Sequence, residues 1–278
     1  MNIQRELGVR AGLMLVPVGI INPTHEPPTF NGVERPNVEK YLIPSTWRES
    51  GIGLYGSTKS GLSYNAYIMA GLKPNDINAD EGIREARQSG FESSTANVAF
   101  AGRLDYRAGL NLTFGASYYV STLESEIEDG NAEAISSLDG ALFNLVEGHV
   151  LYQKNRFEAR GLLVYSGINQ ARDLNTAFGK GAGQSQFGGY GELAYDILPF
   201  FAPATTQKLF AFGRYENYDT QFTTDLTFDN PENNRTDYTF GFTYKPSSRV
   251  AFKADYQLLT SAGNKDIQQL NLGVGYNF

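Results

Sequence analysis

The 278-residue sequence contains no cysteine and no long run of apolar residues. Without cysteine, it has neither disulfide bonds nor thiolate metal ligands. No stretch reaches the roughly 18 consecutive apolar residues that a transmembrane helix needs. The N-terminal segment "MNIQRELGVRAG" lacks the basic-then-apolar order of a signal peptide, so we expect a secreted protein of this sequence to be a mature form or a fragment.

Basic residues are also scarce, because 23 Lys and Arg stand against 30 Asp and Glu, a net charge of -7. Nucleic-acid binding favours a basic surface, so we expect no nucleic-acid partner. His25 and His149 are the only histidines, and the pair His25-Glu26 lacks the second histidine of a zinc-protease motif. The acidic segments 124–133 and 225–237 lack calcium-loop spacing. No serine nucleophile stands near His149, so we do not expect the protein to be an enzyme. From the motifs above, we expect neither a bound metal ion nor a cofactor.

Alternation of apolar and polar residues dominates the sequence, whereas the helical period is almost absent. Most alternating segments are about 9–13 residues long, close to what a tilted strand needs to cross a bilayer. Aromatic residues, 13% of the chain, often lie at segment ends, as in the girdles of membrane barrels. We count about twelve segments, at residues 5–17, 48–56, 61–72, 95–107, 110–121, 141–153, 157–166, 187–197, 208–217, 238–245, 250–260 and 267–278.

The connections between these segments alternate between long and mostly short ones. In an up-and-down meander every second connection lies at the same end, so long polar loops gather at one end and tight turns at the other. This pattern predicts an all-β fold, a transmembrane antiparallel up-and-down β-barrel of about 12 strands, formed by residues 1–278 as a single domain. A soluble β-sandwich also alternates, and it stays open as an alternative.

The polar face of the predicted strands is rich in Gly, Ser, Thr and Asn and carries both signs of charge, which suits a wet lumen. Because the two signs nearly balance, the sequence does not determine an ion selectivity, and cross-strand ion pairs are an alternative role for most of these residues. The candidate pore-lining residues are Arg10, Arg103, Asp105, Arg107, Glu147, His149, Arg160, Arg214, Glu216 and Lys253.

A Pro-rich loop at 18–50 is unusual for its length and its five prolines, which make it stiff and largely non-helical. We expect a rigid loop of this kind to fold into the barrel mouth and narrow the pore; packing on the surface of neighbouring loops is the alternative. The candidate constriction residues are His25, Glu26, Arg35, Lys40 and Arg48.

The chain ends in "NLGVGYNF", residues 271–278, in the middle of an alternating strand. Leu272, Val274, Tyr276 and Phe278 share one face. This ending resembles the sorting signal that bacterial outer-membrane barrels present to their assembly machinery. We therefore expect recognition through Phe278, and pairing of this strand with segment 5–17 or with a strand that the chain lacks.

Residues 7–56, "LGVRAGLMLVPVGIINPTHEPPTFNGVERPNVEKYLIPSTWRESGIGLYG", resemble bacterial porins of the phosphate-selective porin O/P type. The segment "LFAFGRYENYDT" at 209–220 and the last strand are similar too. The resemblance implies a Gram-negative outer-membrane porin, a passive diffusion channel for small hydrophilic solutes or ions, surrounded by outer-membrane lipid and often a homotrimer.

The resemblance also implies sixteen strands and a constriction loop that folds inward after the fifth. The count of about twelve implies that about four N-terminal strands are missing, which makes 18–50 the constriction loop. This loop carries no excess of basic residues, so phosphate selectivity is not expected. A translocator-type 12-stranded barrel exporting a passenger and a soluble β-sandwich binding module remain alternatives.

Overall fold

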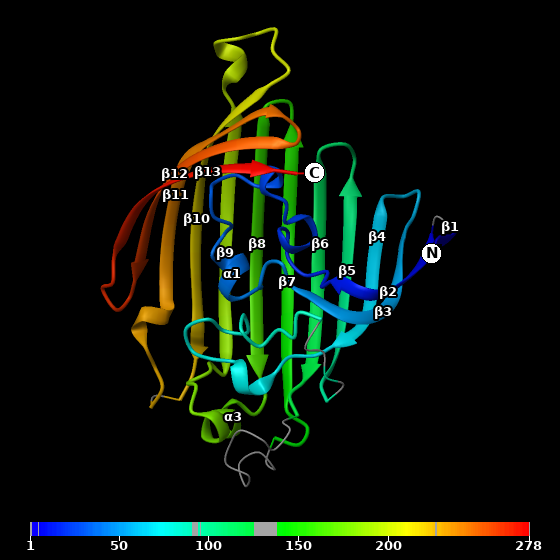
Figure 1. Ribbon diagram of the computed structural model, residues 1–278, viewed down its shortest axis with the longest axis vertical. Helices are drawn as coiled ribbons and strands as arrows, with labels where there is room; N and C mark the ends of the chain where they lie inside the picture. The colour runs from blue at the N-terminus through cyan, green and yellow to red at the C-terminus, as the bar shows by residue number, and fades with distance from the viewer. Residues whose placement is uncertain are drawn as a thin grey trace.

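The computed structural model describes residues 2–4, 6–90, 94, 96–124, 138–225 and 227–277. One antiparallel sheet contains every strand, and each strand pairs with the next along the chain (Figure 1). The strands are β1 (Asn2–Gln4), β2 (Leu7–Leu15), β3 (Arg48–Ser57), β4 (Leu62–Ala70), β5 (Val98–Ala108), β6 (Leu112–Thr122), β7 (Leu142–Lys154), β8 (Phe157–Ile168), β9 (Ser185–Asp196), β10 (Lys208–Thr223), β11 (Asn234–Ser247), β12 (Val250–Ser261) and β13 (Ile267–Tyr276).

All twelve predicted strands are present as β2–β13, and the short β1 precedes them. The observed and predicted lengths differ most for β10 and β11. β10 continues beyond the predicted 208–217 to Thr223, and β11 begins at Asn234, before the predicted 238–245. The added residues are mostly polar, so alternation does not mark them, but they stay in register through pairs such as Tyr218 with Arg235. Ladder hydrogen bonds with neighbouring strands therefore lengthen both strands beyond their apolar pattern.

Helices are short and lie in the connections. They are η1 (Asn22–Thr24), η2 (Pro27–Thr29), α1 (Val38–Tyr41), η3 (Pro74–Asp76), α3 (Ala171–Phe178), η4 (Leu198–Phe200) and η5 (Pro231–Asn233). Within the described part of the chain, no helix has the length and apolar character needed to span a membrane.

The two faces of the sheet have inverted polarity. Large apolar side chains on the outer face are exposed, such as Leu163 at 62% and Leu193 at 59%, whereas charged side chains on the inner face, such as Glu192 at 2%, are buried. A soluble sandwich would bury its apolar face instead. An exposed apolar band around a polar interior is the arrangement of a transmembrane β-barrel, so the predicted fold class is confirmed.

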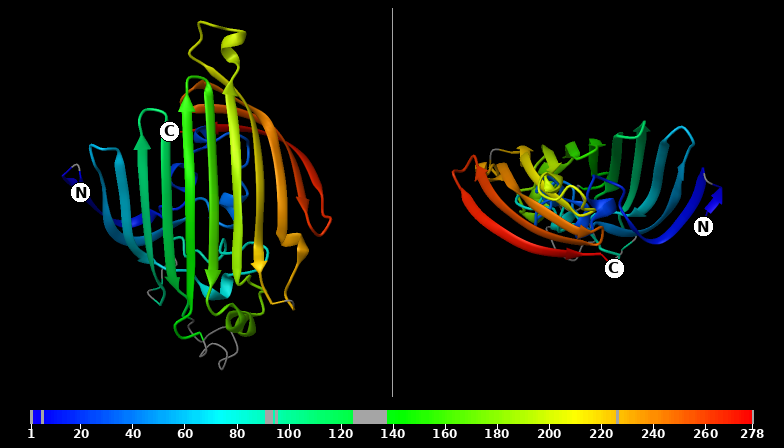
Figure 2. Two further views of the ribbon diagram at one scale, coloured as in Figure 1. Left: turned by 180° about the vertical axis from the view of Figure 1, so that it is seen from behind. Right: turned by 90° about the horizontal axis from the view of Figure 1, so that it is seen from above.

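The sheet is an open curve. Among the described residues, β13 pairs with β12 alone and no pairing joins it to β1 or β2. The view along the strands in Figure 2 shows β1 and β13 at separate ends of the curve. Of the two expected partners of the last strand, segment 5–17 is therefore wrong for this chain, and a strand that the chain lacks stays a prediction. Phe278 lies outside the described residues.

Two connections fill the concave side of the sheet, where Figure 1 shows their dark blue and cyan traces. We call residues 16–47 the inner loop and residues 71–90 the second loop. Their apolar side chains form much of the core, because Val18, Ile21, Val38, Leu42, Ile43 and Trp47 of the first and Leu72, Ile77, Ile83 and Ala86 of the second are all at most 1% exposed. The inner loop therefore folds inside the curve of the sheet.

We predict that Leu163→Arg, near the middle of β8, destabilises the protein in lipid vesicles by about 2–4 kcal/mol, because the outer face lies in hydrocarbon. The fluorescence of the single tryptophan, Trp47, reports denaturant unfolding. Leu110→Arg is the matched control, since Leu110 is 98% exposed in the turn between β5 and β6, where the cost is at most about 1 kcal/mol. Equal effects of the two substitutions would contradict this orientation.

Candidate functional site: the inner loop and its charged wall

The neck of the inner loop is closed by hydrogen bonds among buried groups. The Val16 N–H donates to the Trp47 carbonyl over 3.0 Å. The Asn22 side-chain amide donates to the carbonyls of Val16 at 2.7 Å and Trp47 at 3.0 Å, and accepts from the Trp47 N–H at 2.7 Å. Trp47 also packs against Tyr119 of β6 with ring centroids 4.6 Å apart. Asn22 thus gives the buried Trp47 N–H its acceptor and adds a second donor to the carbonyls of Val16 and Trp47.

Backbone N–H groups further along the inner loop donate to carboxylates of the wall. The Val33 N–H donates to Asp255 of β12 over 2.5 Å, and the Val38 N–H donates to Glu216 of β10 over 3.1 Å. These bonds satisfy backbone groups of a segment that has little regular structure. They are charge-assisted, which makes them stronger than bonds between neutral groups.

Two side-chain amides of the same loop bind two further carboxylates. Asn31 donates to Glu192 of β9 over 3.1 Å, and Asn37 donates to Asp237 of β11 over 2.7 Å. Four consecutive strands, β9 to β12, therefore each supply one carboxylate that holds the inner loop.

Arginines on the wall compensate the charge of these carboxylates. Arg214 lies 3.3 Å from Glu192 and 2.9 Å from Glu216, and Arg160 of β8 lies 3.3 Å from Glu192. Arg214 also donates to the Glu34 carbonyl of the inner loop. Since Arg214 is 2% exposed, its pairing removes the large cost of a buried lone charge. Arg160 and Arg214 therefore form cross-strand ion pairs, the alternative role expected for the charged residues of the inner face.

A second cluster lies on β5 to β7. Arg103 donates to Asp105 through Nε at 2.7 Å and Nη2 at 2.9 Å, and it also donates to the Gly19 carbonyl of the inner loop. His149 lies between two carboxylates, with Nε2 3.1 Å from Asp105 and Nδ1 2.5 Å from Glu147. Through Arg103 and the Gly19 carbonyl, this cluster holds the start of the inner loop. The carboxylates of β9 to β12 hold the remainder of the loop.

Glu39 of the inner loop is fully buried, and its carboxylate accepts hydrogen bonds from the Tyr190 hydroxyl and the Ile21 N–H, both at 2.6 Å. Burial raises the pKa of Glu39 to about 7 despite these bonds. Gly19 has a φ of +79°, and a Cβ there would lie 2.5 Å from the Glu39 Oε2 atom. Glycine at this position therefore permits both the turn and the close approach.

Three pore-lining candidates remain: Arg10 near one edge of the sheet, Arg107 near the end of a strand, and Lys253 against the inner loop. Arg10 is exposed on β2, where it donates to the Tyr67 hydroxyl over 3.4 Å. Arg107 is exposed at the turn end of β5. Lys253 is 6% exposed, and its Nζ lies 3.6 Å from the ring centroid of Phe30 in the inner loop.

The constriction candidates divide into three places. Arg35 and Lys40 line a cavity described below. The carbonyl of His25 accepts from Arg35, and Glu26 directly precedes η2. Arg48 is a correction to the expected set: it is the first residue of β3, on the outward face it shares with exposed Ile52. The loop ends at Trp47, and the strand alternation turns the next side chain away.

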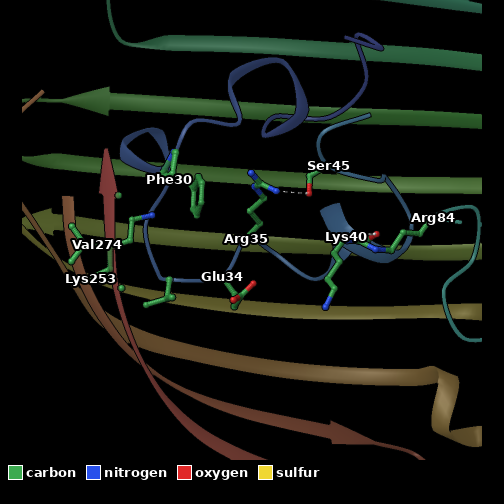
Figure 3. A pocket seen from close by; sticks show the side chains of 12 residues that line it. Phe30, Glu34, Arg35, Lys40, Ser45, Arg84, Lys253 and Val274 are labelled. Carbon is green, nitrogen blue, oxygen red and sulfur yellow. Dashed lines mark hydrogen bonds between the residues drawn. The ribbon is translucent and has the colours of Figure 1, made fainter. Parts of the chain in front are cut away.

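The inner loop, the second loop, β12 and β13 enclose a cavity of about 250 Å³ (Figure 3). Arg35, Lys40 and Ser45 come from the inner loop, Arg84 from the second loop and Lys253 from β12. A further cavity of about 540 Å³ adjoins it, because both are lined by Glu34 and Lys40.

Sequence reasoning did not single out Glu39, Arg84, Asn31 or Asn37 as site residues. Asn31 and Asn37 lie in the predicted constriction loop, but amides in a loop are common and nothing local marks their partners. Arg84 belongs to a connection with no pattern that relates it to the Pro-rich loop. Only the folding of both connections into the same concave face brings these residues together.

No family model matches the chain. It is 37% identical over 267 residues to an uncharacterized protein of Aquifex aeolicus (strain VF5), covering 92% of this chain. The chain spans 58% of the length of that relative.

Solved structures with the same fold include three outer-membrane proteins. OmpT of Vibrio cholerae has a TM-score of 0.59 at 11% identity, covering 98% of this chain and 77% of that one. The anion-selective porin from Comamonas acidovorans has a TM-score of 0.55 at 11% identity, and the match covers 97% of this chain and 74% of that one. The outer-membrane channel DcaP of Acinetobacter baumannii has a TM-score of 0.54 at 12% identity, and the match covers 97% of this chain and 71% of that one. The fold is thus that of porin-type outer-membrane β-barrels.

Glu39 predicts a pH dependence. Its pKa in the folded protein, about 7, exceeds the usual 4.5, so its contribution to stability is full below pH 4.5 and is lost as the pH rises to about 7. This loss amounts to about 3 kcal/mol. Glu39→Gln should remove it, as denaturant unfolding at pH 5 and 7.5 would measure. Glu34→Gln, in the same loop but exposed, is the control and should retain the dependence. Identical profiles for Glu39→Gln and the unmodified protein would contradict the assignment.

A disulfide tests the position of the inner loop. A Cβ built on Gly273 of β13 lies 3.7 Å from the Val33 Cβ, close to the mean separation of about 3.8 Å in disulfides. Because the chain has no other cysteine, Val33→Cys with Gly273→Cys should form one bond on oxidation, detectable by mass spectrometry. Val33→Cys with Leu272→Cys is the control, since Leu272 is 75% exposed on the outer face. Free thiols in both pairs would show that the loop is docked elsewhere.

Proposed function

We propose that the chain forms the wall of a passive diffusion channel for small hydrophilic solutes or ions in the bacterial outer membrane, with its lumen narrowed by the inner loop. One observation carries the proposal: an exposed apolar outer face surrounds a charged inner face on which a loop from the same chain is docked. Lipid accounts for the outer face and water for the inner one.

The proposal assigns the inner-face charges two roles. Arg160, Arg214 and Glu216 hold the inner loop in place, while exposed Arg10 and Arg107 line the open part of the lumen. The resemblance to the phosphate-selective porin O/P type remains a prediction at this finer level. No catalytic role is part of the proposal.

Closure of the wall belongs to the same proposal. In a bilayer the free edge of β13, and that of β2 beyond its short pairing with β1, need backbone partners. We propose that further strands supply them, in keeping with the greater length of the Aquifex relative. Residues 1–278 then belong to one transmembrane domain. Recognition of Phe278 by the assembly machinery and assembly into a homotrimer are also proposals.

A translocator barrel is the less supported alternative. Such a barrel carries a passenger or a helix through its lumen. Here the concave face is occupied by the inner loop, which fastens to β9–β12 through Glu192, Glu216, Asp237 and Asp255. A permanently docked loop suits the narrowing of a channel for small solutes better than the passage of a polypeptide.

Planar-bilayer recordings test the proposal. The protein expressed from its natural reading frame should give discrete single-channel steps. Replacing residues 24–44 by a short Gly-Ser linker, which keeps the neck formed by Val16, Asn22 and Trp47, should raise the single-channel conductance because the lumen widens.

The oxidised Val33→Cys/Gly273→Cys protein serves as the control, since its loop stays in place and its conductance should stay below that of the protein with the replaced loop. Absence of steps from well-folded protein would exclude a channel. Steps whose conductance does not change on loop removal would exclude narrowing by the inner loop.

A further inference from the structure

The cavity in Figure 3 carries more positive than negative charge: Arg35, Lys40, Arg84 and Lys253 line it, and Glu34 is the only carboxylate among its described lining residues. We propose that this cavity binds a small organic carboxylate with an apolar body. The inference rests on the proposed function, because it names the class of solute that the narrowed part of the lumen would recognise.

Lys253 is the first reason. It is 6% exposed, and its Nζ has no hydrogen-bond partner among the described residues. Asp255, the nearest acidic residue on the same strand, is already engaged by the Val33 N–H and the Asn271 amide. The contact with the face of the Phe30 ring offsets only part of the cost of a buried ammonium. An anion in the cavity would supply the missing counter-charge.

Arg35 provides the second cation. It donates to the Ser45 hydroxyl at 3.4 Å and the His25 carbonyl at 3.1 Å, both neutral acceptors, while its Nε is buried without a partner in the described part of the chain. Its Cζ lies 5.7 Å from the centroid of the same Phe30 ring that Lys253 contacts. Two cations that are not neutralised by docking the loop thus face one aromatic side chain.

The other end of the cavity adds weaker positive charge. Arg84 lies 3.5 Å from Glu81 in a partly exposed pair and donates to the Lys40 carbonyl. Its charge is therefore partly compensated. Figure 3 shows Lys40 and Arg84 at the end of the cavity away from Lys253, and Lys40 also lines the larger cavity. A bound anion would approach Lys253 and Arg35 most closely.

The apolar part of the lining decides between kinds of anion. Pro27, Phe30, Val33 and Val274 surround the end of the cavity near Lys253. A strongly hydrated inorganic anion gains nothing from carbon surface, whereas an organic acid buries its hydrocarbon body there and directs its carboxylate to the cations. The volume of about 250 Å³ corresponds to roughly eight water molecules, which suits one small organic anion.

The adjoining larger cavity shows no such preference. Arg235 and Lys265 line it together with Glu232 and Asp237, so its charges balance. Recognition of an anion is therefore local to the smaller cavity.

Calorimetric titration of the detergent-solubilised protein with benzoate, benzylamine and inorganic phosphate tests the proposal. Benzoate should bind saturably, phosphate more weakly, and benzylamine, which has the opposite charge on a similar body, not at all. Lys253→Met keeps the apolar stem and should weaken benzoate binding about 10-fold or more.

Lys245→Met is the matched control. Lys245 lies on neighbouring β11 beside Phe210, with its Nζ 5.3 Å from that ring, and it does not line the cavity. Its substitution should leave the affinity for benzoate within about 2-fold. Formation of the Val33→Cys/Gly273→Cys crosslink in each variant background, in samples separate from those titrated because both residues line the cavity, verifies that the loop is still docked. If Lys253→Met does not fold, Arg84→Gln takes its place with an expected loss of about 3-fold.

The outcomes separate this inference from the proposed function. Steps in a bilayer without benzoate binding would overturn the carboxylate site and leave the channel standing. Benzoate binding without single-channel steps would overturn the channel and leave the carboxylate site standing. Phosphate binding as tight as benzoate binding would make the site one for inorganic anions, and equal losses in Lys253→Met and Lys245→Met would reduce it to general attraction by the lumen.

Discussion

The structure depends on one set of interactions: hydrogen bonds from the inner loop to four wall carboxylates, one from each of β9 to β12. A segment of about 30 residues with little helix or strand has many backbone groups to satisfy, and inside a curved sheet it cannot rely on bulk water. Asp255 and Glu216 accept backbone N–H groups of the loop, and Glu192 and Asp237 accept side-chain amides. Carboxylates suit this role because each accepts several hydrogen bonds at once. Glu192, for example, accepts from Asn31 and pairs with two arginines.

The same interactions sort the charges of the inner face into two kinds. Arg160, Arg214 and Arg103 are paired with carboxylates and serve the docking of the loop. Lys253 and Arg35 form none of the ion pairs found among the described residues and face a cavity. A count of charges treats both kinds alike. In the proposed channel, only the second kind would offer an uncompensated field to a solute, so selectivity would depend on a few positions rather than on the net charge of -7.

The inverted polarity of the sheet and the docked loop require each other. An outer face made of exposed Leu, Val, Phe and Tyr is stable in hydrocarbon, which supplies no hydrogen bonds and therefore leaves all polar groups to the inside. The inner loop meets those polar groups on one side and packs its own apolar residues, such as Val38 and Trp47, with those of the second loop. The apolar residues of the two loops therefore form a core on the concave side of the wall. A cavity remains where the inner loop does not pack closely against β12 and β13.

Alternation by itself determined the class of fold, the twelve long strands and which face of each is apolar, because side chains of a strand alternate whatever its neighbours are. Alternation missed the ends of β10 and β11, where pairing with a neighbouring strand replaces the apolar pattern. It included Arg48 in a predicted strand, but the bounds 18–50 of the Pro-rich loop also made Arg48 a constriction candidate, although this first residue of β3 faces outward. The pairing of Arg214 with Glu192 and Glu216 required the register of β9 and β10. The meeting of Arg84, Arg35 and Lys253 required two connections and the end of the sheet to fold into one space. Local pattern carries information about period, whereas contacts between segments far apart in the chain are decided by tertiary packing alone.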